Sequence, residues 1–157
     1  MADACPSLRS AGPDETRAIG ARIARLLQPG DVLLLQGELG AGKTMLTQGI
    51  GEGLAVAEPV KSSSFVLLNE YHGRLTLYHA DLFRLTDSLE VADLALEEVA
   101  APGALVVEWP ERAWAELPPE HLLIRIDEGG DTDRVLTLVP RGERYESMAR
   151  ELLEVAP

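Results

Sequence analysis

The sequence has few cysteines and lysines and no long apolar run, and each shortage excludes a class of protein. Its 157 residues include one cysteine, Cys5, which rules out an intrachain disulfide and fits a reducing cytoplasm. No apolar run approaches the roughly 20 residues of a membrane span, and the N-terminus lacks the apolar segment of a secretory signal. This length suits one compact core. We therefore expect a cytoplasmic protein without membrane contact, in which residues 1–157 form a single domain.

The charge of the chain limits which ligands it can bind. Twenty-six acidic and fourteen basic residues give a formal net charge of −12, and the only lysines are Lys43 and Lys61. Because nucleic acids are bound largely through cations that neutralise phosphates, we do not expect this chain to bind RNA or DNA directly. A small anionic ligand is still compatible with the charge, since salt screens repulsion beyond about 8 Å. Such a ligand needs a local cation or a cluster of N–H donors.

Hydrophobic patterning predicts strands that alternate with helices along the first two-thirds of the chain. We expect strands at residues 31–36, 65–71, 75–80, 104–108, 122–127 and 134–139. Helices are expected at residues 14–27, 43–54, 88–99, 110–117 and 143–153. Alternating strands and helices favour parallel strand pairs. The strands at 65–71 and 75–80, and those at 122–127 and 134–139, are expected to form two hairpins, which add antiparallel pairs. The expected fold is therefore α/β with a mixed sheet.

The strongest motif lies at residues 37–44, which match the phosphate-loop pattern G-x-x-x-x-G-K-[ST] at every fixed position. Its glycines allow backbone N–H groups to converge on a phosphate, and the helix that follows adds its positive end. Lys43 supplies a full charge for the β- and γ-phosphates, and the Thr44 hydroxyl suits Mg²⁺. The motif predicts a P-loop NTPase-like three-layer fold with helices on both faces. The expected contacts are Gly37, Glu38, Leu39, Gly40, Ala41, Gly42, Lys43, Thr44 and the adjoining Met45.

A nucleotide site of this kind also needs a carboxylate near Mg²⁺, commonly at the end of a buried strand. Glu108, Asp81 and Asp127 each end an apolar run. Asp127 enters a Glu-Gly-Gly-Asp turn, where turn chemistry alone explains an acid. Glu108 and Asp81 would face the loop if their strands run parallel to the first, and Trp109 follows Glu108. A capping or surface-paired acid is the alternative for each.

Other polar residues carry weaker signals. Residues 61–64 read Lys-Ser-Ser-Ser, either a flexible connection or a switch-like segment that senses the γ-phosphate. The three histidines have no metal-ligand spacing, so we expect no zinc site. The only asparagine, Asn69, precedes Glu70, so the N-K-x-D segment of a GTPase is absent.

Two further classes of nucleotide protein remain. A small-molecule kinase would use arginines such as Arg74, Arg84 or Arg112, although no insertion has the length of a lid. A nucleotide-controlled interaction protein would instead use slow hydrolysis to reset its binding to partners. The sequence motifs alone leave both open.

Several motifs together resemble the bacterial TsaE (YjeE) family of small P-loop ATPases. The matching segments are residues 37–44, 62–65, 69–71, 79–85 and 107–112, in the same order. The family acts in forming N6-threonylcarbamoyladenosine at tRNA position 37 with the proteins TsaB and TsaD. The resemblance implies that tRNA is reached only indirectly, which agrees with the acidic charge. Two departures occur, because Met45 and Ser63 stand where the family usually has threonine and proline.

The resemblance also implies site roles. Lys43 and Thr44 would serve ATP and Mg²⁺, Glu108 would be a metal ligand, and Asp81 would support hydrolysis at the metal site. Ser64 would belong to a switch-like loop. Adenine contacts are implied for residues 14–16, including Thr16, and for Arg134. No arginine is assignable as a catalytic finger, so we expect slow turnover without partners.

Overall fold

The computed structural model describes residues 5–61 and 68–154. Its strands are β1 (Ser7–Ser10), β2 (Val32–Gln36), β3 (Leu68–Tyr71), β4 (Leu77–Asp81), β5 (Ala104–Glu108), β6 (His121–Glu128) and β7 (Arg134–Arg141). They form one seven-stranded sheet in the order β1-β7-β6-β2-β5-β4-β3. The central strands β6, β2, β5 and β4 are parallel, and β7, β1 and β3 add antiparallel pairs at the two edges. The expected mixed sheet is confirmed.

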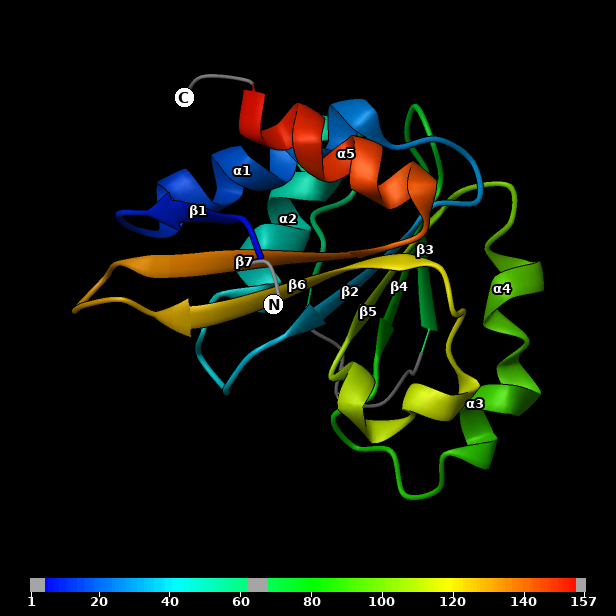
Figure 1. Ribbon diagram of the computed structural model, residues 1–157. Coiled ribbons are helices and arrows are strands. Elements are labelled where there is room, and N and C mark those ends of the chain that lie inside the picture. Colours follow the sequence, from blue (N-terminus) through cyan, green and yellow to red (C-terminus); the bar gives the residue numbers. More distant parts are fainter. Residues whose placement is uncertain (1–4, 62–67, 155–157) are drawn as a thin grey trace.

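Helices cover both faces of this sheet (Figure 1). They are α1 (Pro13–Leu26), α2 (Lys43–Gly53), α3 (Leu89–Leu94), α4 (Leu96–Val99) and α5 (Glu143–Glu154). On β2, Leu33 and Leu35 pack into the cluster that contains residues of α1, α2 and α5, whereas Leu34 packs into the opposite cluster with residues of α3 and α4. Side chains of a strand alternate between faces, so a strand covered on both sides reads as a continuous apolar run. The expected three-layer fold is confirmed.

Close packing between α1 and α2 explains the glycines inside α2. A Cβ atom at Gly49 would lie 2.1 Å from the carbonyl oxygen of Arg17, and one at Gly20 would lie 2.4 Å from that of Leu46. Only glycine allows the two backbones to approach this closely. The helix that follows the phosphate loop is therefore held rigidly against α1.

Three local predictions differ from the structure. The single helix predicted at residues 88–99 is wrong, because Ala95 is left-handed (φ 48°) and separates α3 from α4. The helix predicted at residues 110–117 is instead two 3₁₀ turns, Pro110–Arg112 and Trp114–Glu116. Strand β1 was not predicted, because its four residues lack apolar alternation and gain their bonds from β7.

The predicted strand at residues 65–71 is described only from Leu68 onward, where it forms β3. Among the described residues, no helix has the length and apolar character needed to cross a membrane.

Candidate functional site

The phosphate loop joins the carboxyl end of β2, in the centre of the sheet, to the first residue of α2. Gly40 and Gly42 have φ values of 84° and 112°, in a region that residues with a side chain rarely adopt. Gly42 is the N-cap of α2 and has no side chain to bond the first N–H groups of the helix. These free N–H groups and the helix dipole make the loop a site for an anion.

Lys43 begins α2 and is buried, with 5% of its surface exposed. Its Nζ atom donates hydrogen bonds to the carbonyl oxygens of Gly37 and Glu38, the latter at 2.9 Å, and lies 4.2 Å from the centroid of the Trp109 ring. Burial lowers the pKa of Lys43, and the carboxylate of Glu108 is the strongest opposing influence. The ammonium group is thus positioned inside the loop.

The two candidate carboxylates meet at the carboxyl edge of the sheet. Strands β4 and β5 run parallel, and their register places Asp81 beside Glu108. Both line a cavity of about 290 Å³ together with Lys43, Thr44 and Trp109. Its remaining lining comes from Leu39, Gly40, Gly42, Met45 and Phe83. The structure therefore brings the loop lysine, the threonine and both acids into one cavity.

The two acids are held in different ways. Asp81 accepts a hydrogen bond at Oδ1 from the N–H of Phe83 at 3.0 Å, and burial raises the pKa of Asp81 despite this bond. Glu108 is almost fully buried and is hydrogen-bonded to the imidazole of His79. The Glu108 carboxylate is therefore held by a side-chain hydrogen bond, whereas burial disfavours the charged form of Asp81.

This donor set fits Mg²⁺. The cation takes oxygen ligands and commonly keeps several waters, using one or two carboxylates together with phosphate oxygens. The cavity offers the hydroxyl of Thr44 and the carboxylates of Glu108 and Asp81. Residues 5–61 and 68–154 contain no group of three or more histidine, cysteine, aspartate or glutamate residues arranged for a metal. A cation held here would therefore need a nucleotide or water to complete its ligands.

A second cavity, of about 140 Å³, adjoins the phosphate loop and shares Gly40, Gly42 and Met45 with the first. Of the residues predicted near adenine, Thr16 and Arg134 line it, whereas Asp14 and Glu15 do not. The rest of its lining comes from Gly12, Pro13, Ala41 and Thr132. Arg134 donates from Nε to the carbonyl oxygen of Ala41 at 3.1 Å, and Thr16 is bonded to the buried Ser10 hydroxyl. The two cavities are therefore neighbours at the phosphate loop.

Other predicted residues lie apart from these cavities or outside the description. Ser64 falls outside the described residues. Asp127 is exposed on β6 and lines neither cavity. Arg74 donates to the carbonyl oxygen of Ala24, so it stabilises the fold, and Arg112 lies 5.7 Å from the ring centroid of Phe83. Arg84 is exposed.

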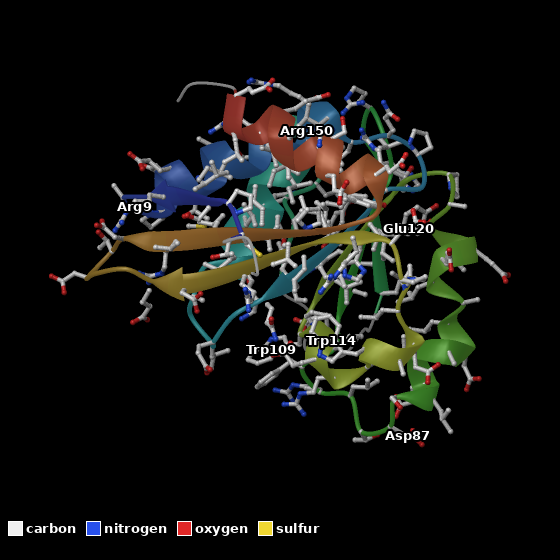
Figure 2. All side chains as sticks on the ribbon, viewed as in Figure 1. Arg9, Asp87, Trp109, Trp114, Glu120 and Arg150 are labelled. Carbon is white, nitrogen blue, oxygen red and sulfur yellow. The ribbon has the colours of Figure 1, made fainter. Side chains whose placement is uncertain are left out.

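A larger cavity, of about 570 Å³, contains none of the predicted site residues. It is lined in part by Asp31, Arg144, Tyr145 and Glu120, and Figure 2 shows Glu120 well apart from Trp109. Asp31 and Arg144 form an ion pair, and Tyr145 is hydrogen-bonded to the N–H of Val32. Its buried polar groups are therefore used to join α5 to the start of β2.

Sequence reasoning missed His79 and Thr132. Thr132 lies in the turn between β6 and β7 and bonds the carbonyl oxygen of Ala11, a contact without a local sequence signal. His79 was assessed as a zinc ligand and as part of the family segment at residues 79–85, and it was given no role of its own. Its position two residues before Asp81 places both on one face of β4, and that spacing was the available signal.

A buried parallel strand that enters a glycine-rich loop and a helix N-terminus, beside strands that end in carboxylates, defines a P-loop NTPase-like α/β protein. The family model described as "Threonylcarbamoyl adenosine biosynthesis protein TsaE" matches residues 10–136. The chain therefore belongs to the TsaE family, whose members are named for tRNA threonylcarbamoyladenosine biosynthesis.

Individual relatives agree with this assignment. The chain is 43% identical over 146 residues to the tRNA threonylcarbamoyladenosine biosynthesis protein TsaE of Bacillus subtilis, covering 92% of this chain and 91% of that protein. It is 44% identical over 138 residues to the Streptomyces coelicolor protein of the same name, covering 82% and 93%. A crystal structure of Bacillus subtilis YdiB superposes with a TM-score of 0.80 at 38% identity, covering 97% of both chains.

Proposed function

We propose that this chain binds Mg²⁺-ATP on residues 37–44 and hydrolyses it slowly, and that it thereby assists N6-threonylcarbamoylation of adenosine 37 in tRNA. One observation carries the proposal: Lys43, Thr44, Asp81 and Glu108 line a single cavity at the N-terminus of α2. Phosphoryl transfer depends mainly on positioning and charge neutralisation. This cavity supplies one cation, one hydroxyl and two carboxylates for that purpose.

Each side chain has a distinct role in this proposal. Lys43 and the first N–H groups of α2 bind the phosphates, and Thr44 and Glu108 hold the metal. When bound, Mg²⁺ neutralises charge that develops on the phosphate oxygens. Because Oδ1 of Asp81 is bonded to the N–H of Phe83, its Oδ2 is the oxygen that orients the attacking water and accepts its hydrogen bond.

The second cavity is proposed to hold the base. It adjoins the phosphate loop through Gly40 and Gly42, so a nucleotide whose phosphates occupy the loop can extend toward Thr16 and Arg134. The bond from Arg134 to Ala41 links this base site to the loop backbone. Adenine is proposed from the family and from the lack of a guanine-binding segment in the sequence.

Partner proteins are proposed to complete the site. No arginine among the described residues lines the cavity of Lys43, and we propose that a partner supplies the positive charge that accelerates many such reactions. The net charge of −12 argues against direct contact with tRNA. We therefore propose that the chain acts in the cytoplasm through a complex of TsaB and TsaD.

Turnover measurements test this proposal. Phosphate release from ATP is measured with the chain alone and with TsaB and TsaD added. We expect slow release alone and faster release in the complex. Transfer of labelled phosphate to a small metabolite would instead support the kinase alternative, and an equal rate with and without partners would contradict partner dependence.

A further inference from the structure

His79 is buried against Glu108 and makes no other hydrogen bond within the described part of the chain. The two residues lie on adjacent parallel strands, and 1% of the surface of His79 and 3% of that of Glu108 are exposed. Their hydrogen bond joins Nε2 of His79 to Oε2 of Glu108 at 2.5 Å. The other ring nitrogen, Nδ1, is buried and has no partner within residues 5–61 and 68–154. The contact with Glu108 is therefore the one hydrogen bond that these residues give His79.

The direction of this bond follows from chemistry. A carboxylate can only accept, so Nε2 carries the hydrogen and donates it to Oε2. When Nε2 carries the only ring proton, Nδ1 has only a lone pair, and no buried N–H is left without an acceptor. The bond occupies one oxygen of Glu108 and leaves Oε1 for another ligand.

Lys43 makes this restraint important. Lys43 and Glu108 line the same cavity, and opposite charges attract strongly where water is scarce. Nevertheless, the ion pairs within 4.0 Å among the described residues do not include this pair. Lys43 instead bonds the carbonyl oxygens of Gly37 and Glu38. Lys43 is thus held by backbone carbonyl oxygens and Glu108 by His79, and the two side chains do not pair with each other.

We infer that His79 is a positioning residue that fixes the Glu108 carboxylate for a divalent cation and keeps it from pairing with Lys43. This inference rests on the proposed function, because it assigns a purpose to a contact within the same site. A hydrogen-bonded partner behind a metal ligand orients that ligand, and its loss commonly lowers metal affinity or activity about 10- to 100-fold. Without His79, Glu108 would be free to pair with Lys43, and both the cation and phosphate contacts would weaken.

The test measures nucleotide affinity rather than activity. The Kd for ATP is determined by calorimetry with excess Mg²⁺ and again with EDTA. The Kd in EDTA divided by the Kd in Mg²⁺ reports how much the cation contributes to affinity. In His79→Leu we expect this ratio to fall about tenfold or more from the wild-type value. In His79→Gln, whose amide nitrogen reaches as far as Nε2, we expect the ratio to stay within about threefold of wild type.

Leu77→Ala provides a matched control, because Leu77 is fully buried on the same face of β4 but is not part of the cavity. We expect it to destabilise the fold without changing the ratio. If His79→Leu does not fold, as judged by circular dichroism, the comparison uses His79→Asn, whose amide is too short to reach Glu108, against His79→Gln.

The outcomes separate the two proposals. A wild-type ratio in folded His79→Leu, equal ratios in His79→Asn and His79→Gln, or an equal loss in Leu77→Ala would overturn the role of His79. Wild-type protein that binds no nucleotide in either buffer would overturn the proposed function itself.

Discussion

The Nζ atom of Lys43 lies 4.2 Å from the centroid of the Trp109 ring, while the same atom donates to two carbonyl oxygens of its own loop. Trp109 has a left-handed backbone (φ 59°), which is strained for a bulky residue. This backbone turns the chain directly after Glu108, at the end of β5. A phosphate in the loop would compete with the indole ring for the lysine ammonium.

Nucleotide binding should therefore change the fluorescence of Trp109. Moving the ammonium from the ring toward a phosphate alters the electric field at the indole, so we expect a saturable change in emission when Mg²⁺-ATP is added. Trp114, which is 43% exposed, is not part of the Lys43 cavity. The change should persist in Trp114→Phe and disappear in Trp109→Phe. An unaltered signal in Trp109→Phe would contradict the contact.

Asp81→Asn should make the metal-free protein more stable near neutral pH. Burial raises the pKa of Asp81 above its ordinary value of 3.8. Between these two pKa values the folded chain holds a proton that the unfolded chain has lost, so stability falls as pH rises through this window. Above the pKa of folded Asp81, this loss of stability stays constant. Asparagine has no such charge and keeps the oxygen that accepts the Phe83 bond.

Thermal unfolding in EDTA checks this prediction. We expect a higher Tm for Asp81→Asn than for wild type near neutral pH, and a smaller difference below the ordinary pKa of aspartate. A lower Tm for the variant near neutral pH would show that the Asp81 charge stabilises the fold.

Gly49→Ala should destabilise the protein by about 1–3 kcal/mol, the usual range for overpacking. The added Cβ would lie 2.1 Å from the carbonyl oxygen of Arg17, so α1 and α2 would have to separate. Gly130→Ala is the control, because its Cβ would meet no atom closer than 3.6 Å and Gly130 does not have a positive φ. Chemical denaturation measures both. Equal stability of the two variants would contradict the packing argument.

Arg134→Ala should weaken ATP binding about 3- to 10-fold, the size of one lost hydrogen bond. Affinity for inorganic triphosphate, which lacks a base, separates two causes of such a loss. If Arg134 contacts the base, triphosphate affinity should not change. An equal loss for triphosphate would show that Arg134 acts by positioning the loop through Ala41. Arg125→Ala, an exposed arginine on β6, is the control for removed charge.

The features that local sequence determines were predicted correctly. The run of leucines in β2 is apolar throughout because both of its faces are covered, and the glycine pattern after it has few structural alternatives. The alternation of strands and helices predicted parallel pairs in general, and the parallel direction of β4 and β5, which the sequence left as a condition, is met in the structure. That direction alone implied that Asp81 and Glu108 end at the same edge of the sheet.

Features that depend on tertiary contacts were not predicted. The bond between His79 and Glu108 requires the register of two strands separated by 22 residues, which no local pattern encodes. The left-handed residue Ala95 interrupts a helix that no glycine or proline breaks in the sequence, and the apolar residues Leu89 and Val99 are 62% and 43% exposed rather than packed in the core. Strand β1 forms because β7 offers an open edge, and its own residues show no apolar pattern.

Calorimetric titration with Mg²⁺-ATP tests the central claim most directly, with wild type and Lys43→Ala compared. Lys43 should bond the phosphates as a charged donor, and each such bond contributes about 1.5–3 kcal/mol. We predict saturable binding by the wild type and an affinity at least about tenfold lower in Lys43→Ala. Absence of binding heat for the wild type, or equal affinity in the two proteins, would contradict a nucleotide site at residues 37–44.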